Sequence, residues 1–408
     1  MKYGLIGEKL GHSFSKPIHE KIADYTYEIK EIKREDLDLF LEEKDFIGIN
    51  VTIPYKSDVI PYLDYIEPIA EKIGAVNTIV NREGKLYGYN TDFYGMKMLI
   101  EKSGFDYKGK KVLIFGTGGT SKTAGAVAES LGAAEIIKVG RREKVNYENV
   151  YSLHGDADYI INTTPIGMYP DNEGCIVDLT RFKNLKGITD AVYNPLKTRL
   201  CQNGEQLGIK SETGLYMLIF QAVLAVEKFI GESLDKTRLA DEIYSEILKE
   251  KRNIVLIGMP GSGKSTIGKA LSEKLGKEFI DTDEMIVSSY GNISDIFALK
   301  GEAYFRDKET EQVKKAAKEN GRIIATGGGA VLKKENVLSL GQNGIIIFLN
   351  RPIEDIIPTS DRPLSSDYES LKKRFDERYD IYVSSADKEI FVSGSIDDTV
   401  NKIIQELQ

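Results

Sequence analysis

The chain contains 408 residues, of which 41% are hydrophobic and 29% are charged, and its formal net charge is −8. Because this length exceeds what one hydrophobic core can organise, we expect a globular protein of two or three domains. Its 63 acidic residues outnumber its 55 lysines and arginines, which excludes the basic excess that nucleic acid or anionic membranes require. We therefore expect small-molecule substrates, no nucleic-acid or membrane partner, and no obligatory protein partner.

The cysteines and the first residues of the chain indicate in which cellular compartment we expect the protein. Cys175 and Cys201 are the only cysteines, and their spacing matches no CxxC or zinc-ligand pattern, as is typical of proteins in a reducing cytosol. The opening residues, MKYGLIGEKLGHS, contain no long apolar segment, and no stretch approaches membrane length. We expect a cytoplasmic protein.

Short apolar runs rich in β-branched residues predict buried strands, and the longer stretches between them have helical spacing. Together they favour an α/β fold with parallel sheets. The predicted strands are 46–51, 111–115, 136–139, 159–162, 188–193, 253–257, 322–326 and 345–349.

An amphipathic helix is predicted over 234–250, since Leu239, Ile243 and Ile247 fall on one face with charges opposite. A short charged group then leads directly into the strand at 253–257. We therefore place the main domain boundary near residue 250, between domains 1–250 and 251–408.

The first glycine-rich loop, GTGGTSKTA at 116–124, follows a predicted strand and opens a predicted helix. Free N–H groups at such a helix start suit the pyrophosphate of a dinucleotide, although similar loops also serve only to pack a helix on a sheet. The next strand ends in Gly140, Arg141 and Arg142 instead of an acidic residue. Because guanidinium groups suit a 2′-phosphate, we expect NADP in preference to NAD. The predicted cofactor-binding residues are Gly116, Gly118, Gly119, Arg141 and Arg142.

Six ordered motifs in the first 250 residues together resemble shikimate dehydrogenase. They are GHSFSKPIHE (11–20), NVTIPYK (50–56), GAVNT (74–78), YNTD (89–92), DAVYNPLKT (190–198) and GLYMLIFQA (214–222). The resemblance implies an α/β substrate-binding domain, built from 1–95 with 214–250, and a Rossmann-like NADP domain at 96–213. It also implies reduction of 3-dehydroshikimate with NADPH.

The same resemblance implies that Lys56 and Asp92 form the catalytic pair. Reduction of a ketone needs a proton for the developing alkoxide, and a lysine held by a carboxylate can supply it. Read alone, Lys56 would be a solvated loop lysine and Asp92 the N-cap of a helix beginning near Phe93. The implied substrate-binding residues are Ser13 and Ser15 for the carboxylate, Thr52, Asn77 and Gln221 for ring hydroxyls, and Tyr193 near the nicotinamide.

The second glycine-rich loop, GMPGSGKST at 258–266, matches GxxxxGK[ST] fully, follows the strand at 253–257 and precedes a helical pattern. This motif indicates binding of a nucleoside triphosphate with Mg²⁺, and we expect ATP. The predicted nucleotide-binding residues are Gly258, Gly261, Gly263, Lys264, Ser265 and Thr266.

Downstream motifs resemble shikimate kinase in order: FIDTDEMI (279–286), GEAYFRDKE (301–309), TGGGAV (326–331), SDRPL (360–364) and RYDIYVSSA (378–386). The resemblance implies a P-loop small-molecule kinase domain with a parallel sheet. The implied roles are Lys264 at the transferred phosphate, Ser265 and Asp281 at Mg²⁺, Asp283 as the base, Arg306 and Arg378 at the substrate carboxylate, Gly328 and Gly329 at the ring, and Arg362 in a lid over the nucleotide.

The two halves together predict one bifunctional enzyme of the shikimate pathway, which reduces 3-dehydroshikimate and then phosphorylates the shikimate formed. Two alternatives stay open. The domains could act on related molecules, such as a quinate-like acid or a neutral polyol, although Arg306 and Arg378 favour an acid. One half could instead be catalytically silent and regulatory, which the presence of Lys56, Asp92 and Lys264 argues against.

Overall fold

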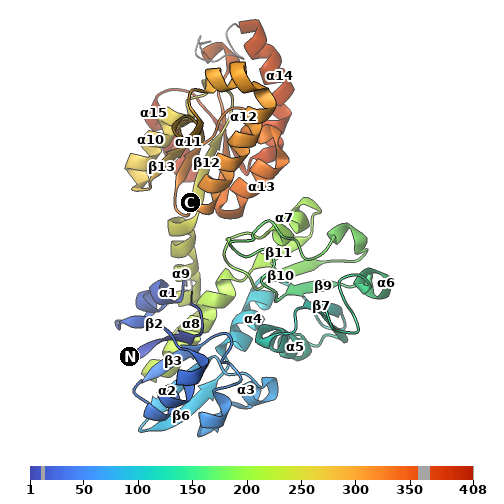
Figure 1. Ribbon diagram of the computed structural model, residues 1–408, viewed down its shortest axis with the longest axis vertical. Coiled ribbons are helices and arrows are strands. Elements are labelled where there is room, and N and C mark those ends of the chain that lie inside the picture. Colours follow the sequence, from blue (N-terminus) through green and yellow to red (C-terminus); the bar gives the residue numbers. More distant parts are fainter. Residues whose placement is uncertain (11–13, 357–367, 408) are drawn as a thin grey trace. The chain divides into compact units, whose positions relative to one another are not determined.

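The computed structural model describes residues 1–10, 14–356 and 368–407. The described chain forms two compact units, Met1–Glu246 and Ile247–Gln408, each of α/β type (Figure 1). Helix α9 (Lys236–Lys251) carries the chain from the first unit into the second, and Ile243 and Ile247 on its predicted apolar face are buried. No helix among the described residues is long and apolar enough to cross a membrane.

The first unit begins with a mixed sheet of order β2-β1-β3-β5-β6-β4. Its strands are β1 (Tyr3–Gly7), β2 (Tyr27–Glu31), β3 (Gly48–Val51), β4 (Tyr65–Ile66), β5 (Thr78–Arg82) and β6 (Lys85–Tyr89). The expectation of parallel pairing is wrong for this sheet at two places, because β5 pairs antiparallel with both β3 and β6. For β5 and β6 the cause lies at Glu83 and Gly84, whose positive φ angles of 52° and 82° form a two-residue hairpin turn that reverses the chain.

Five helices accompany this sheet: α1 (Ser15–Ile22), α2 (Leu37–Glu43), α3 (Pro68–Ile73), α4 (Thr91–Lys102) and α8 (Leu215–Ile230). Helix α8 is buried along most of its length and packs against α4 and α1. Since α8 follows the second sheet in sequence, its packing returns residues beyond 214 to the first sheet.

The second sheet is wholly parallel, with order β11-β10-β9-β7-β8. Its strands are β7 (Lys111–Phe115), β8 (Glu135–Val139), β9 (Tyr159–Asn162), β10 (Gly187–Asp190) and β11 (Lys210–Thr213), with helices α5 (Gly119–Ser130), α6 (Val150–His154) and α7 (Arg199–Gln206). The chain passes from β7 to β8 on one side and then to β9 on the other. The loop after β7 therefore lies at the switch point of strand order, where open α/β sheets bind ligands.

The second unit contains a five-stranded parallel sheet of order β13-β14-β12-β15-β16. The strands are β12 (Asn253–Ile257), β13 (Phe279–Asp281), β14 (Ile323–Ala325), β15 (Gly344–Asn350) and β16 (Lys388–Phe391). The helices are α10 (Lys264–Leu275), α11 (Thr282–Tyr290), α12 (Ile293–Lys318), α13 (Lys334–Asn343), α14 (Tyr368–Ser385) and α15 (Ile396–Glu406).

Alternate residues of β12 enter two separate cores of this unit. Ile254 and Leu256 pack with α10 and α15, whereas Val255 and Ile257 pack with α12, α13 and α14. Because successive side chains of a strand point to opposite faces, a strand covered by helices on both sides is apolar throughout. This explains why NIVLI is a continuous apolar run.

Asp190, at the end of β10, makes the stability of the first unit depend on pH. Its carboxylate is fully buried and accepts hydrogen bonds from Asn162 Nδ2 at 2.9 Å, Val192 N at 3.0 Å and Thr198 Oγ1 at 2.7 Å. Burial nevertheless raises the pKa of the Asp190 carboxyl to about 7. The folded state therefore binds this proton more tightly than the unfolded state, whose carboxyl has a pKa near 3.8.

We expect this carboxyl to lower the unfolding free energy by up to about 1.4 kcal/mol per pH unit as pH rises from about 4 to 7, with no further slope above. Asp190→Asn, of the same shape, should lack that component. Both cysteines lie in the first unit, so urea-dependent thiol labelling at about pH 5 and pH 7.5 follows this unit alone. An unchanged pH dependence in the variant would contradict the expectation.

Candidate active sites

The predicted pair in the first unit is formed directly. Lys56 Nζ donates a hydrogen bond to Asp92 Oδ2 at 2.5 Å, and the two side chains are only 17% and 13% exposed. Asp92 lies in the first turn of α4, but Asn90 caps that helix by accepting from Phe93 N. The interpretation of Asp92 as the helix cap is therefore wrong, and its carboxylate is available to hold the lysine.

A buried polar network joins two other predicted residues. The backbone N–H of Thr91 donates to Asn77 Oδ1 at 2.7 Å, which directs the amide nitrogen of Asn77 to Thr91 Oγ1 at 3.0 Å. Thr91 Oγ1 in turn donates to Gln221 Oε1 at 3.2 Å. The structure thus brings together Asn77 and Gln221, which are 144 positions apart, and adds Thr91, which the sequence reasoning missed.

The remaining predicted substrate-binding residues are placed as follows. Ser15 is buried as the first residue of α1, and Thr52 is half-buried directly after β3. The ring of Tyr193 lies 5.6 Å from that of Phe14, and burial raises the pKa of its hydroxyl. Ser13 lies outside the described residues.

The glycine-rich loop after β7 ends beside the Lys56–Asp92 pair. Gly116 has a φ of 115°, and a Cβ there would lie 2.4 Å from Thr163 Oγ1, so only glycine fits. A Cβ on Gly118, which precedes α5, would meet no described atom within 4 Å. One on Gly119 would lie 3.9 Å from Lys56 Cδ. The loop therefore presents an open backbone face next to Lys56, as a bound dinucleotide would need.

The predicted 2′-phosphate residues, Arg141 and Arg142, are exposed and follow β8 after one intervening residue, Gly140. Strand β8 neighbours β7 in the parallel sheet, so the two arginines follow the same sheet edge as the glycine-rich loop. Two guanidinium groups at this edge fit a dinucleotide with an additional phosphate.

In the second unit, the P-loop connects β12 to α10. Gly258 has a φ of 148°, and a Cβ there would lie 2.8 Å from Leu349 O of the adjacent strand. Lys264, the first residue of α10, is buried, and its Nζ donates to Gly258 O and Met259 O at 2.9 Å each. The ammonium group is thereby held within the loop that would surround the phosphates. Together with Lys264, the residues Gly261, Gly263 and Thr266 line one pocket at this loop.

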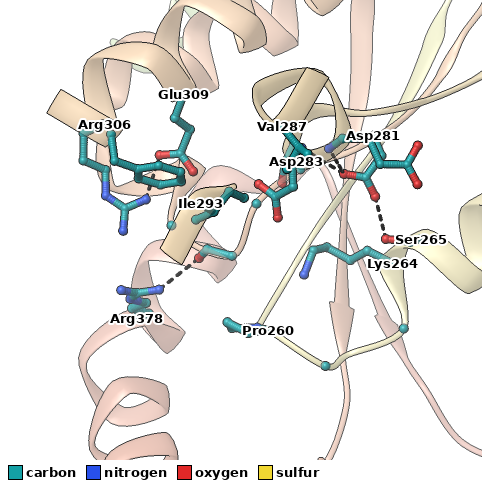
Figure 2. Close-up of a pocket in the computed structure, with 18 of the residues that line it drawn as sticks. Pro260, Lys264, Ser265, Asp281, Asp283, Val287, Ile293, Arg306, Glu309 and Arg378 are labelled. Atoms are coloured by element: carbon teal, nitrogen blue, oxygen red, sulfur yellow. Dashed lines mark hydrogen bonds and ion pairs between the residues drawn. The ribbon is translucent and has the colours of Figure 1, made fainter. Parts of the chain in front are cut away.

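Two oxygen groups meet beside this lysine. Ser265 Oγ donates to Asp281 Oδ2 at 2.6 Å, and Asp281 Oδ1 accepts from Asp283 N as the N-cap of α11 (Figure 2). A hydroxyl and a carboxylate at one point fit Mg²⁺, which takes few protein oxygens and keeps several waters. Among the described residues there is no cluster of three or more His, Cys, Asp or Glu side chains able to hold a metal.

Asp283 lies between the P-loop and a group of arginines (Figure 2). Burial, reinforced by the nearby carboxylates of Asp281 and Glu309, raises the pKa of Asp283 to about 6. Arg306 Nη1 donates to the buried Glu309 Oε2 at 2.7 Å, and Arg378 Nη1 donates to Gly328 O at 3.2 Å. The site thus has the P-loop at one end, a central carboxyl group and two arginines at the far end.

At positions 328 and 329 neighbouring protein atoms leave no room for a side chain, so both residues must be glycine. A Cβ on Gly329 would lie 2.2 Å from Arg306 Nη1, and one on Gly328 would lie 2.7 Å from atoms of the Pro260 ring. We expected these glycines to let the backbone approach a ligand. In the structure, the groups that lie close to their backbone are Arg306 and Pro260 of the P-loop.

The P-loop, Asp283 and the arginines Arg306 and Arg378 all line one pocket of about 920 Å³. It includes two arginines that sequence reasoning missed, Arg351 and Arg374. Arg351 lies two residues after the end of the predicted strand at 345–349 and directly follows β15, and the carboxyl ends of parallel strands commonly carry ligand-binding residues. Arg374 precedes Arg378 by four positions, which places both on one helix face. Arg362 lies outside the described residues.

The first unit carries a partly buried lysine–carboxylate pair beside a dinucleotide-type loop, and the second carries a complete P-loop facing an arginine-lined pocket. These features define an oxidoreductase fold joined to a small-molecule kinase fold. The shikimate kinase family model matches residues 260–408, and the model for the shikimate dehydrogenase substrate-binding domain matches residues 5–79. The chain belongs to the shikimate dehydrogenase family and also contains a shikimate kinase domain, as both resemblances indicated.

Individual relatives agree with this assignment of the first unit. The chain is 37% identical over 265 residues to a shikimate dehydrogenase (NADP(+)) from Clostridium perfringens, covering 60% of this chain and 97% of the relative. It is also similar to the crystal structure of shikimate dehydrogenase 1 from Peptoclostridium difficile, with a TM-score of 0.56, 37% identity, and coverage of 60% and 97%. A third similar structure is the Thermus thermophilus shikimate 5-dehydrogenase in complex with NADP(H) and shikimate, with a TM-score of 0.53, 27% identity, and coverage of 59% and 97%.

Proposed function

We propose that the chain is a bifunctional enzyme that reduces 3-dehydroshikimate to shikimate with NADPH and then phosphorylates shikimate with MgATP. The observation that carries the proposal is the position of Asp283 between the P-loop and the guanidinium groups of Arg306 and Arg378. A small acid that carries a hydroxyl group matches this order of groups. The Lys56–Asp92 pair beside the first glycine-rich loop supports the reductive half.

In the reductive half, NADPH supplies the hydride that forms the new C–H bond at the ring ketone. As the carbonyl electron pair moves to oxygen, Lys56 Nζ gives that oxygen a proton, and NADP⁺ is released with the alcohol. Asp92 holds the ammonium group in position through its hydrogen bond. Asn77 and Gln221, fixed through Thr91, hold ring hydroxyls, and Ser15 together with Ser13 donates to the substrate carboxylate. Thr52 and Tyr193 complete the substrate-binding set.

In the second half, Mg²⁺ bound to ATP supplies charge neutralisation at the phosphates, and Ser265 and Asp281 would hold it. Asp283 accepts the proton of the substrate hydroxyl as that oxygen bonds to the γ-phosphorus and the bond to the ADP oxygen breaks. Lys264 lies against the transferred phosphate. Arg306 and Arg378 orient the acid, because planar guanidinium groups match carboxylate geometry.

The two reactions are consecutive in this proposal. The ketone that Lys56 protonates becomes the hydroxyl that Asp283 deprotonates, so the first product is the second substrate. The domain limits that follow are a substrate-binding part of residues 1–95 with 214–250, an NADP-binding part of residues 96–213, and a kinase part of residues 251–408.

The proposal is tested by supplying the purified protein with 3-dehydroshikimate, NADPH, ATP and Mg²⁺. We expect loss of NADPH absorbance together with formation of shikimate phosphate, and no phosphorylated product when NADPH is omitted. Quinate and its dehydro form are tested as alternative substrates. A higher kcat/KM for them would show that they, and not the shikimate compounds, are the substrates. Turnover of neither pair would refute the proposal.

A further inference from the structure

Arg351 occupies a position at the nucleotide end of the kinase pocket that no assigned role explains. It follows β15 directly and lines the pocket together with the P-loop residues. Its Nη1 lies 3.7 Å from the point where a Cβ on Gly263 would stand. Because β15 pairs with β12, which leads into the P-loop, the carboxyl ends of the two strands hold this side chain against the loop.

Among the residues that the structure describes, Arg351 makes no hydrogen bond or ion pair, and its Nε is buried without a partner. The other arginines of the pocket differ in this respect, since Arg306 is bonded to Glu302 and Glu309 and Arg378 to Gly328. A buried guanidinium N–H without an acceptor is unfavourable, and a ligand that brings oxygen atoms would remove that penalty.

The location of Arg351 indicates which ligand group supplies those oxygens. Gly263 belongs to the loop that surrounds phosphates in this motif, whereas the acid-binding arginines lie at the far end of the pocket, beyond Asp283 (Figure 2). A guanidinium group forms strong, charge-assisted bonds with phosphate oxygens. Arg351 also directly follows β15, so the parallel sheet sets the position of its backbone.

We propose that Arg351 binds phosphate oxygens of the nucleotide, as a fixed cation in addition to Lys264. The inference rests on the proposed use of ATP by this pocket. It assigns to Arg351 a contribution to nucleotide affinity and none to recognition of the acid acceptor.

The test compares Arg351→Gln, Arg351→Lys and the unaltered full-length protein. Calorimetry with MgATP is expected to give a dissociation constant about tenfold higher for Arg351→Gln, as one charge-assisted hydrogen bond predicts. Arg351→Lys, which keeps the charge but loses the planar fork, should recover part of the affinity. Adenosine, measured by competition, should bind all three proteins equally because it carries no phosphate. Lys373→Gln, which removes a charge from an 80% exposed lysine of α14, serves as the matched control.

The outcomes separate this inference from the proposed function. If the unaltered protein binds MgATP and Arg351→Gln binds it equally well, the inference is wrong and the kinase assignment stands. If Arg351→Gln weakens adenosine as much as ATP, Arg351 acts on the base or on folding, and the inference is again wrong. If the unaltered protein does not bind MgATP, the proposed function itself fails. Ketone reduction by the first unit shows in each case that the preparation is active.

Discussion

Replacing Lys56 with methionine is expected to lower kcat for ketone reduction by about 10²- to 10⁴-fold, while phosphorylation of added shikimate continues. The variant keeps the length of the side chain but removes the proton that the developing alkoxide requires. It also leaves the partly buried Asp92 carboxylate without the ammonium group that lies 2.5 Å away. The measurement is NADPH absorbance with saturating 3-dehydroshikimate, together with a kinase assay on the same preparation.

Lys97→Met provides a control for this variant. Lys97 lies on α4, the helix that carries Asp92, but its side chain is 36% exposed and forms an i,i+4 pair with Glu101. Surface pairs of this kind contribute little to stability, so reduction should be almost unchanged. A Lys56→Met protein that kept reductase activity within tenfold of the unaltered enzyme would rule out Lys56 as the proton donor.

Replacing Lys264 with methionine is expected to lower phosphorylation by about 10²- to 10³-fold or more and to leave ketone reduction intact. The lysine supplies a positive charge inside the phosphate loop, and removal of one such electrostatic contact typically has an effect of this size. Methionine would also leave the carbonyl groups of Gly258 and Met259 without the hydrogen bonds that Lys264 donates to them. The assay follows shikimate phosphate formation and NADPH oxidation in parallel.

Lys269→Met is the corresponding control, because Lys269 is on the same helix, α10, with a 57% exposed side chain paired to Glu284. We expect full kinase activity from it. Persistent phosphorylation by Lys264→Met would contradict the assigned role of Lys264. Loss of both activities would instead indicate a protein that fails to fold.

The features that were predicted correctly are those that a short stretch of consecutive residues is enough to define. The P-loop is recognisable because phosphate binding requires glycine, lysine and a hydroxyl at fixed spacing. The strands of the two parallel sheets are recognisable because burial on both faces makes them continuously apolar, as in 111–115 and 253–257. The hairpin turn at Glu83 and Gly84 was not recognised, since a glutamate with a positive φ is uncommon.

The sequence by itself determined that two nucleotide-type loops lie in one chain and which families their surroundings resemble, because these are patterns of residues close together in the chain. Only the tertiary structure decided that Thr91 joins Asn77 to Gln221 and that Arg351 lies against the P-loop. Such contacts join strand ends and helices far apart in sequence. They are fixed by the packing of sheets and helices, which no local pattern of residues records.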